Sequence, residues 1–197
     1  PDFADGIPRA DGSLPSNVSA ANESLITAVR ATEACEDHGG FGLFESPPSR
    51  AAGSSLPMAG RENHASMFDT SWMRAWRASS KTGYVLMDQC ATGMKVRKAT
   101  RFECSASLHT HFQRYVGPCV CTHPSEYHEA NVEGEQVTDA DGKFRSAELA
   151  SYTPKFNSLI ADSVRAFVAA RDADAIAADA ARAAAAASAA LPTPMQA

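Results

Sequence analysis

The sequence predicts an α/β domain in which helices flank a small sheet, and three features of the apolar pattern carry this prediction. Apolar residues between Leu25 and Cys35 recur at helical spacing after Asn22, which can cap a helix, and glycines 39 and 40 end it. The short apolar run 41–44 follows at once, and its length is typical of a buried strand. A second such run covers 84–87. Helix, glycine turn and strand in this order form an α/β step.

Three further elements complete the predicted domain. Residues 66–77 are expected to form a helix capped by Asp69 or Thr70, with Trp72 and Trp76 on one side. This pair is interpreted as core packing in preference to a stacking platform for bases. Residues 100–104 are a candidate third strand. The last helix follows Pro154, and its predicted buried face consists of Phe156, Leu159, Ile160, Val164, Phe167 and Val168.

Composition divides the chain into three parts. Residues 1–20 are rich in Pro, Gly, Ser and Asp without an apolar period, so a linker or extended arm is expected. Residues 21–170 form the predicted α/β domain. Residues 171–197 are an alanine-rich, low-complexity tail that favours helix but has almost no apolar anchor, so we expect a weakly docked or frayed helix.

Charge and cysteine usage narrow the classes of function. The net charge of −5 and the pI near 5.7 exclude a global positive field that would attract nucleic acid, so any such contact must be local. The five cysteines are an odd number, which favours thiols or a metal site in a reducing, intracellular compartment, the cytoplasm or nucleus. No apolar run approaches the roughly 20 residues of a membrane-spanning helix. Pro1 suggests processing or a piece of a longer polypeptide.

Two clusters of polar residues follow predicted strands. Glu45 comes directly after the first one, where open α/β sheets bind ligands, although it can equally cap the following loop. After the second strand, residues 88–93 lead into the one local concentration of positive charge, which suits a phosphate backbone or forms a solvated face. Its residues are Lys95, Arg97, Lys98 and Arg101. Cys90 in this segment is a less favoured candidate nucleophile, because no histidine lies close to it in the sequence.

A third cluster has the residue types of a metal site. Cys119, Cys121, His123 and His128 lie within ten residues, and cysteine and histidine are the ligands that zinc prefers. The Cys-x-Cys spacing is less typical of zinc than Cys-x-x-Cys. Core thiols and surface histidines are therefore the alternative interpretation.

The order of these short motifs resembles the C-terminal part of the divergent cytosine-5 DNA methyltransferase-like domains of phages and mobile elements. The resemblance covers about residues 22–168. It rests on these segments: Glu45-Ser-Pro, Asp88-Gln-Cys-Ala-Thr-Gly93, Lys98-Ala-Thr100-Arg101, Cys121-Thr-His123 and Ala150-Ser-Tyr152-Thr-Pro154. It implies a partial Rossmann-like sheet with flanking helices.

The resemblance also implies roles for particular residues. Glu45 would hold a flipped cytosine by its ring nitrogen, while Gly93, Lys98, Thr100 and Arg101 would correspond to the motif that supports the catalytic loop and the base. The family's Glu-Asn is Glu45-Ser46 here, and the chain has neither a Gly-rich loop for S-adenosylmethionine before its first helix nor a Pro-Cys nucleophile upstream of Glu45. S-adenosylmethionine binding would then require a missing N-terminal portion.

Three hypotheses follow from the sequence. The first is a truncated or remnant methyltransferase-like domain from a mobile-element polyprotein, which binds nucleic acid through Glu45 and the basic loop. The alternative is a zinc-stabilised, non-enzymatic interaction module. The third is an enzyme that uses Cys90.

Overall fold

The computed structural model describes residues 12–49, 54, 66–128 and 152–189, and these residues contain both α-helices and β-strands. The helices are α1 (Ser16–Asp37), α2 (Ser71–Ser80), α3 (Ala106–Tyr115) and α4 (Pro154–Ala189). The strands are β1 (Leu43–Ser46), β2 (Gly83–Asp88) and β3 (Ala99–Cys104). Short 3₁₀ turns are η1 (Met67–Asp69), η2 (Gln89–Thr92) and η3 (Ser125–Tyr127). The predicted mixed α/β class is confirmed.

The sheet has the order β1-β3-β2, and both of its pairings are antiparallel. β1 pairs with β3 from Leu43↔Cys104 to Ser46↔Arg101, and β2 pairs with β3 from Gly83↔Cys104 to Asp88↔Ala99. A Rossmann-like sheet is mostly parallel, so that part of the expectation is not confirmed by the described residues. The physical reason lies in the connection, because the short segment between β2 and β3 suits an antiparallel turn and is too short for a helical crossover.

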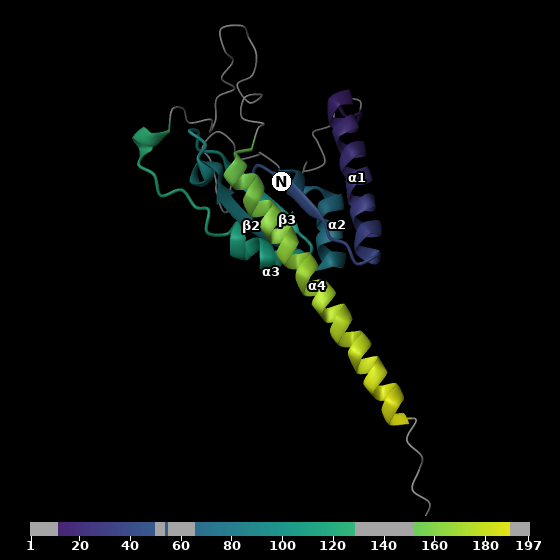
Figure 1. Cartoon of the computed structure of the whole chain (residues 1–197). Helices are drawn as coiled ribbons and strands as arrows, with labels where there is room; N and C mark the ends of the chain where they lie inside the picture. The colour runs from purple at the N-terminus through teal and green to yellow at the C-terminus, as the bar shows by residue number, and fades with distance from the viewer. Residues whose placement is uncertain (1–11, 50–53, 55–65, 129–151, 190–197) are drawn as a thin grey trace, which may run out of the picture.

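Helices cover both faces of this sheet (Figure 1). On one face, Val85, Phe102 and Cys104 pack against α3 and α4 through residues such as Phe112 and Phe156. Strand side chains alternate between faces, so the neighbouring positions point toward α1 and α2. The core on that side consists of Val29, Phe44, Phe68, Met73 and Trp76.

The interpretation of the tryptophan pair as core is confirmed for Trp76 on α2. Its side chain is fully buried, and its ring packs edge-on against Phe44 with centroids 4.9 Å apart. Trp72 is half-buried. Thr70, one of the two predicted caps, accepts the backbone N–H of Met73 at 3.4 Å at the start of α2.

The N-terminal boundary differs from the prediction. α1 begins at Ser16, so residues 16–20 of the predicted arm are helical and Asn22 lies inside the helix. Pro15 precedes the first turn with φ −53°, and its carbonyl accepts the N–H groups of Val18 and Ser19. Proline at a helix start costs no hydrogen bond, which explains the earlier beginning. Residues 1–11 lie outside the described part.

α4 runs without interruption across the predicted boundary at residue 170. Residues 169–185 are exposed, and this half of the helix projects away from the sheet (Figure 1). Alanine propensity and the Asp179–Arg182 ion pair support the helix there, although little of it is buried. Position 170 therefore marks a change in burial and not in secondary structure. Within the described ranges, none of the helices combines the length and apolar content needed to cross a bilayer.

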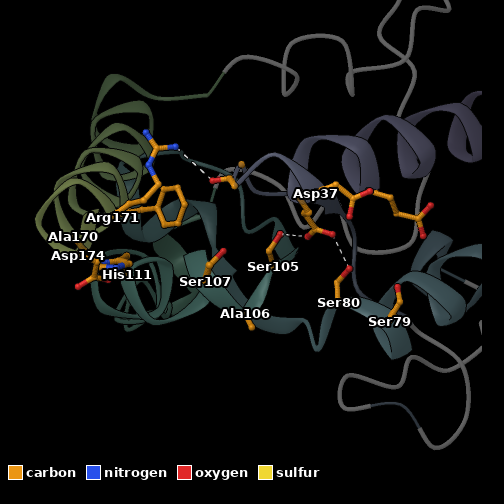
Figure 2. A pocket seen from close by; sticks show the side chains of 15 residues that line it. Asp37, Ser79, Ser80, Ser105, Ala106, Ser107, His111, Ala170, Arg171 and Asp174 are labelled. Carbon is orange, nitrogen blue, oxygen red and sulfur yellow. Dashed lines mark hydrogen bonds between the residues drawn. The ribbon is translucent and has the colours of Figure 1, made fainter. Parts of the chain in front are cut away.

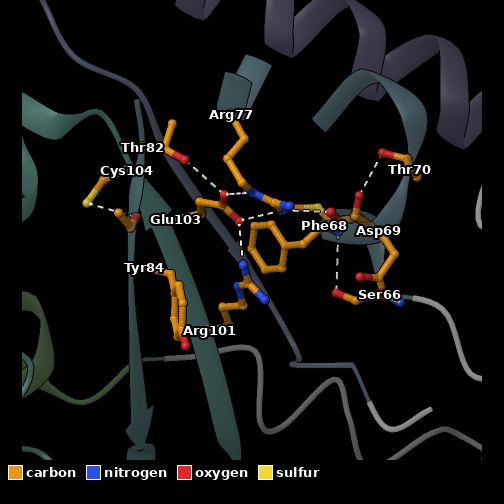
Figure 3. A network of polar contacts seen from close by, with 12 residues as sticks. Ser66, Phe68, Asp69, Thr70, Arg77, Thr82, Tyr84, Arg101, Glu103 and Cys104 are labelled. Atoms are coloured by element: carbon orange, nitrogen blue, oxygen red, sulfur yellow. Dashed lines mark hydrogen bonds and ion pairs between the residues drawn. The ribbon is translucent and has the colours of Figure 1, made fainter. Parts of the chain in front are cut away.

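A buried carboxylate ties β3 to its neighbours (Figure 3). Glu103 is 1% exposed and accepts two hydrogen bonds from the guanidinium of Arg77 on α2. It also accepts hydrogen bonds from Arg101 Nη2 at 3.0 Å and from the Thr82 hydroxyl at 3.0 Å. The network joins α2, the start of β2 and two positions of β3.

Aromatic rings enclose one member of this network. The Arg101 guanidinium lies 4.8 Å from the Phe68 ring centre and 4.5 Å from that of Tyr84. Arg77 also donates to the Phe68 carbonyl at 2.8 Å. Arg101 is thus held by two aromatic rings and a carboxylate, and Arg77 by a carboxylate and a carbonyl, which are contacts that guanidinium groups favour.

We predict that Glu103→Ala lowers the free energy of unfolding by about 3 kcal/mol, because it leaves two partly buried guanidinium groups without their acceptor. The matched control is Glu23→Ala on the exposed surface of α1, which should change it by less than about 0.5 kcal/mol. Urea unfolding of both variants measures the difference. Equal stability of the two would show that the network contributes nothing.

Candidate metal centre

Four side chains converge at the end of the sheet where β2 ends and β3 begins. They are Cys90, Cys121, His123 and His128, and their donor atoms all lie within 4.8 Å of one another. Cys90 belongs to η2, and the other three lie in the segment that follows α3. Two sulfurs and two imidazole nitrogens at this separation could hold a metal ion.

The measured separations suit a tetrahedral site. Cys121 Sγ lies 3.8 Å from His123 Nδ1 and 3.5 Å from His128 Nε2. In a tetrahedron with metal–sulfur bonds of about 2.3 Å and metal–nitrogen bonds of about 2.0 Å, the sulfur–nitrogen edge is about 3.5 Å. The two histidines therefore already lie close to bonding positions relative to Cys121.

A tight turn brings Cys90 to this position. β2 ends at Asp88, and η2 closes with Gly93 at φ 105°, a left-handed conformation that favours glycine. The Gly93 N–H donates to the Cys90 carbonyl at 3.0 Å, and the Gln89 side chain donates to the Thr100 hydroxyl at 2.9 Å. Cys90 is fully buried as a result.

Asp88 places the second cysteine beside the first. Its backbone N–H donates to the Cys119 carbonyl at 2.8 Å, and its carboxylate accepts the Cys121 N–H at 3.0 Å. The same carboxylate forms an ion pair with Arg97 at 3.5 Å. Cys121 is thus hydrogen-bonded directly to the last residue of β2.

The predicted ligand Cys119 is replaced by Cys90. Cys119 is 9% exposed and belongs to the core between the sheet, α3 and α4. A turn in which the Val120 N–H donates to the Pro118 carbonyl at 2.8 Å separates it from Cys121. The two cysteines of the Cys-x-Cys pair therefore enter different environments, and only Cys121 joins the cluster.

Stacked rings support one of the histidines. The Tyr127 ring lies parallel to that of His123, with centroids 3.9 Å apart and an interplanar angle of 8°. Lys95 Nζ lies 4.3 Å from the centre of the Tyr127 ring. Residues that orient a ligand in this way tune metal affinity without touching the ion. Sequence reasoning did not single out Tyr127, and its position four residues after His123 was the available signal.

The candidate nucleophile Cys90 has the wrong environment for that role. Burial and then the hydrogen bond and charge of Cys121 raise the pKa of Cys90 to about 12. A free thiolate, the reactive form, is disfavoured at neutral pH. A metal ion would supply the positive charge that stabilises it.

Two residues of the predicted nucleic-acid loop lie inside the fold. Thr100 is fully buried in β3 and accepts the hydrogen bond from Gln89, so it cannot contact a ligand at the surface. Arg101 is engaged by Glu103 and two aromatic rings. Burial therefore removes Thr100 from the predicted surface, and Arg101 contributes to the contacts around Glu103 in this fold.

The remaining cations of that loop lie at the surface beside the metal centre. Lys95 and Arg97 are exposed, although Arg97 is paired with Asp88. Lys98 is half-buried, with Nζ 6.0 Å from the centre of the Tyr152 ring. The predicted basic loop is therefore only partly available to a partner.

Glu45 lies within β1, an edge strand, and is half-buried. Burial, followed by the hydrogen-bonding and charge effects of the Glu45 carboxylate, raises the pKa of Tyr152. The argument that placed Glu45 at a ligand-binding edge assumed parallel strands. In this antiparallel sheet Glu45 instead joins β1 to the segment before α4.

The structure gives Cys90 as the fourth metal ligand, whereas the sequence predicted Cys119. Two serine variants distinguish these ligand sets. Cys90→Ser should lose most of its metal when purified from zinc-supplemented cells, because one of four ligands is removed. Cys119→Ser should keep about one zinc per chain and show a lower melting temperature, since it places a hydroxyl in the core. Elemental analysis of both proteins checks this. Metal retained by Cys90→Ser and lost by Cys119→Ser would restore the ligand set predicted from the sequence.

Comparisons with protein families, with curated proteins and with solved structures found no match for this chain.

Proposed function

We propose that this chain is a zinc-stabilised interaction module that performs no catalysis of its own. The observation that carries the proposal is the convergence of Cys90, Cys121, His123 and His128 within 4.8 Å. Two thiolates and two imidazoles complete the tetrahedral shell that structural zinc takes. Four protein ligands leave no open position for water or substrate, which favours a structural role over a catalytic one.

The metal would fasten a segment that has little else to hold it. After α3, residues 116–128 contain one short turn, η3, and contribute only Val116 and Cys119 to the described core. Metal coordination supplies folding free energy directly where burial cannot. Zinc would join this segment to η2, which lies about thirty residues earlier in the chain.

The same turn also anchors α4. The Thr153 hydroxyl donates to the Thr92 carbonyl at 2.9 Å, and Lys155 Nζ donates to the Ala91 carbonyl at 3.2 Å. Thr153 in turn accepts the Phe156 N–H at 3.2 Å at the start of the helix. A metal that orders η2 would therefore also order the start of α4.

The methyltransferase-like interpretation stays a hypothesis from the sequence. It requires Glu45 to bind a base, whereas the Glu45 carboxylate is engaged by Tyr152 in the structure. The rest of a larger polyprotein as a partner belongs to the same hypothesis. The zinc module rests on a described cluster of side chains and is the better supported proposal.

Removing the metal tests the structural role. Chelation should lower the melting temperature, and zinc at about a thousand times its Kd should restore about 4 kcal/mol of stability. Hydrogen exchange should accelerate in residues 88–93, 116–128 and 152–156, because these segments meet at η2. Magnesium is the control and should restore nothing, since it prefers oxygen ligands. An unchanged melting curve and exchange pattern after chelation would refute the proposal.

The ring that supports His123 provides a finer test. Tyr127→Ala should weaken zinc binding about 10-fold, within the range found for residues that orient ligands, whereas Tyr127→Phe should keep near-normal affinity because the ring remains. Competition with a chromophoric chelator measures both. Melting in excess zinc shows whether either variant is misfolded. Equal losses in the two variants would mean that the hydroxyl, and not the stacking, matters.

A further inference from the structure

Charge is distributed unequally between the two ends of the sheet. The end where β2 begins holds a pocket of about 940 Å³ between α1, α2, α3 and α4 (Figure 2). Four carboxylates and one arginine line it: Glu33, Glu36, Asp37, Asp174 and Arg171. The metal centre lies at the other end of β2, roughly 17 Å away for a strand of six residues.

At the acidic end, the side chains of Glu36 and Arg171 are hydrogen-bonded within the protein. Glu36 accepts hydrogen bonds from the Ser105 and Ser80 hydroxyls, the latter at 2.6 Å, and from Trp76 Nε1 at 3.2 Å. Arg171 donates to the Gly39 carbonyl at 3.5 Å. This end therefore joins helices to one another, and its negative charge would repel a polyanion.

The metal end exposes lysines, and its carboxylates among the described residues are Asp88, which pairs with Arg97, Glu45 beside Tyr152, and the exposed Glu126 of η3. Lys95 and Lys98 follow η2, and Lys155 of α4 reaches η2 through the Ala91 carbonyl. Arg97 lies in the same loop and is balanced by Asp88. A zinc ion with two thiolates is neutral, so the positive charge of this edge comes from the lysines.

We propose that this basic edge, formed by Lys95, Lys98 and Lys155 beside the metal centre, binds the phosphate backbone of single-stranded nucleic acid. The inference rests on the proposed zinc function, because the metal would hold the Tyr127 segment against the lysine loop. It extends that function by naming the partner. The proposed binding site also differs from the one predicted from the sequence, because it omits Thr100 and Arg101 and includes Lys155.

Aromatic rings beneath the lysines favour a single strand over a duplex. Lys95 lies over Tyr127 and Lys98 lies near Tyr152, and both rings are half-buried. Grooves that combine cations with aromatic rings bind single strands, because unpaired bases stack on the rings while the cations follow the phosphates. A lysine drawn to a phosphate would uncover the ring face for a base.

The test compares two triple variants of the zinc-loaded chain of 197 residues. Lys95→Gln, Lys98→Gln and Lys155→Gln remove the edge, whereas Arg30→Gln, Arg74→Gln and Lys81→Gln remove three exposed charges from other elements. Fluorescence anisotropy with a labelled oligothymidylate measures affinity across a salt series. The edge variant should lose at least about 10-fold, and its salt dependence should flatten by about 2 units of slope. The control variant should lose less than about 3-fold.

Further measurements identify the class of partner and test the nucleic-acid inference separately from the zinc proposal. The same sequence as a duplex should bind more weakly than the single strand, and anionic phosphatidylserine vesicles should not bind. Equal losses in both variants, tighter binding of the duplex, or binding of vesicles alone would overturn the inference. Zinc content is measured in every variant. One zinc per chain without oligonucleotide binding would overturn only the nucleic-acid inference, while a chain without zinc would overturn the proposed function.

Discussion

Asp88 is the residue on which the metal end of the molecule depends. Its main chain closes β2 against β3 and binds the Cys119 carbonyl, its carboxylate holds the Cys121 N–H, and its charge fixes Arg97. One buried carboxylate therefore joins the sheet, the segment after α3 and the loop that carries the lysines. A buried charge is tolerated only with such partners, so the positions of the groups around Asp88 are closely constrained. The same contacts therefore also restrict the positions of the metal-ligand atoms of Cys90 and Cys121.

Two other carboxylates perform the same task elsewhere, and together they explain how so small a sheet is held. Glu103 joins β3 to α2 through two guanidinium groups, and Glu36 joins α1 to α2 and α3 through hydroxyl and indole donors. A sheet of three described strands buries limited apolar area. Directed polar contacts between layers therefore supplement the two apolar cores, and a metal would add a further link at the end of β2.

The sequence predicted the local structure well and the long-range pairing poorly. Apolar runs located the three strands, but periodicity within a strand contains no information on the direction of its neighbour, so the antiparallel order was not foreseen. Cys90 was missed as a ligand because it lies 31 residues before Cys121, and only the fold brings them together. Cys119 was predictable as core: in the sequence it continues the helical spacing of Leu108, Phe112 and Val116, and although α3 ends at Tyr115, all four residues are buried.

The zinc site and the lysine edge share several residues. A zinc site without net charge can therefore position the charged side chains of the edge. Zinc bound by two thiolates contributes no net charge, so its effect on a polyanion would be geometric. It would hold Tyr127 under Lys95, and through η2 it would hold Lys155 near Ala91. The chain as a whole carries a charge of −5, so scattered lysines would attract a polyanion only weakly. Three lysines lie at the metal end of the sheet and the carboxylates of the pocket lie at the opposite end. The net charge of the chain does not show this uneven distribution.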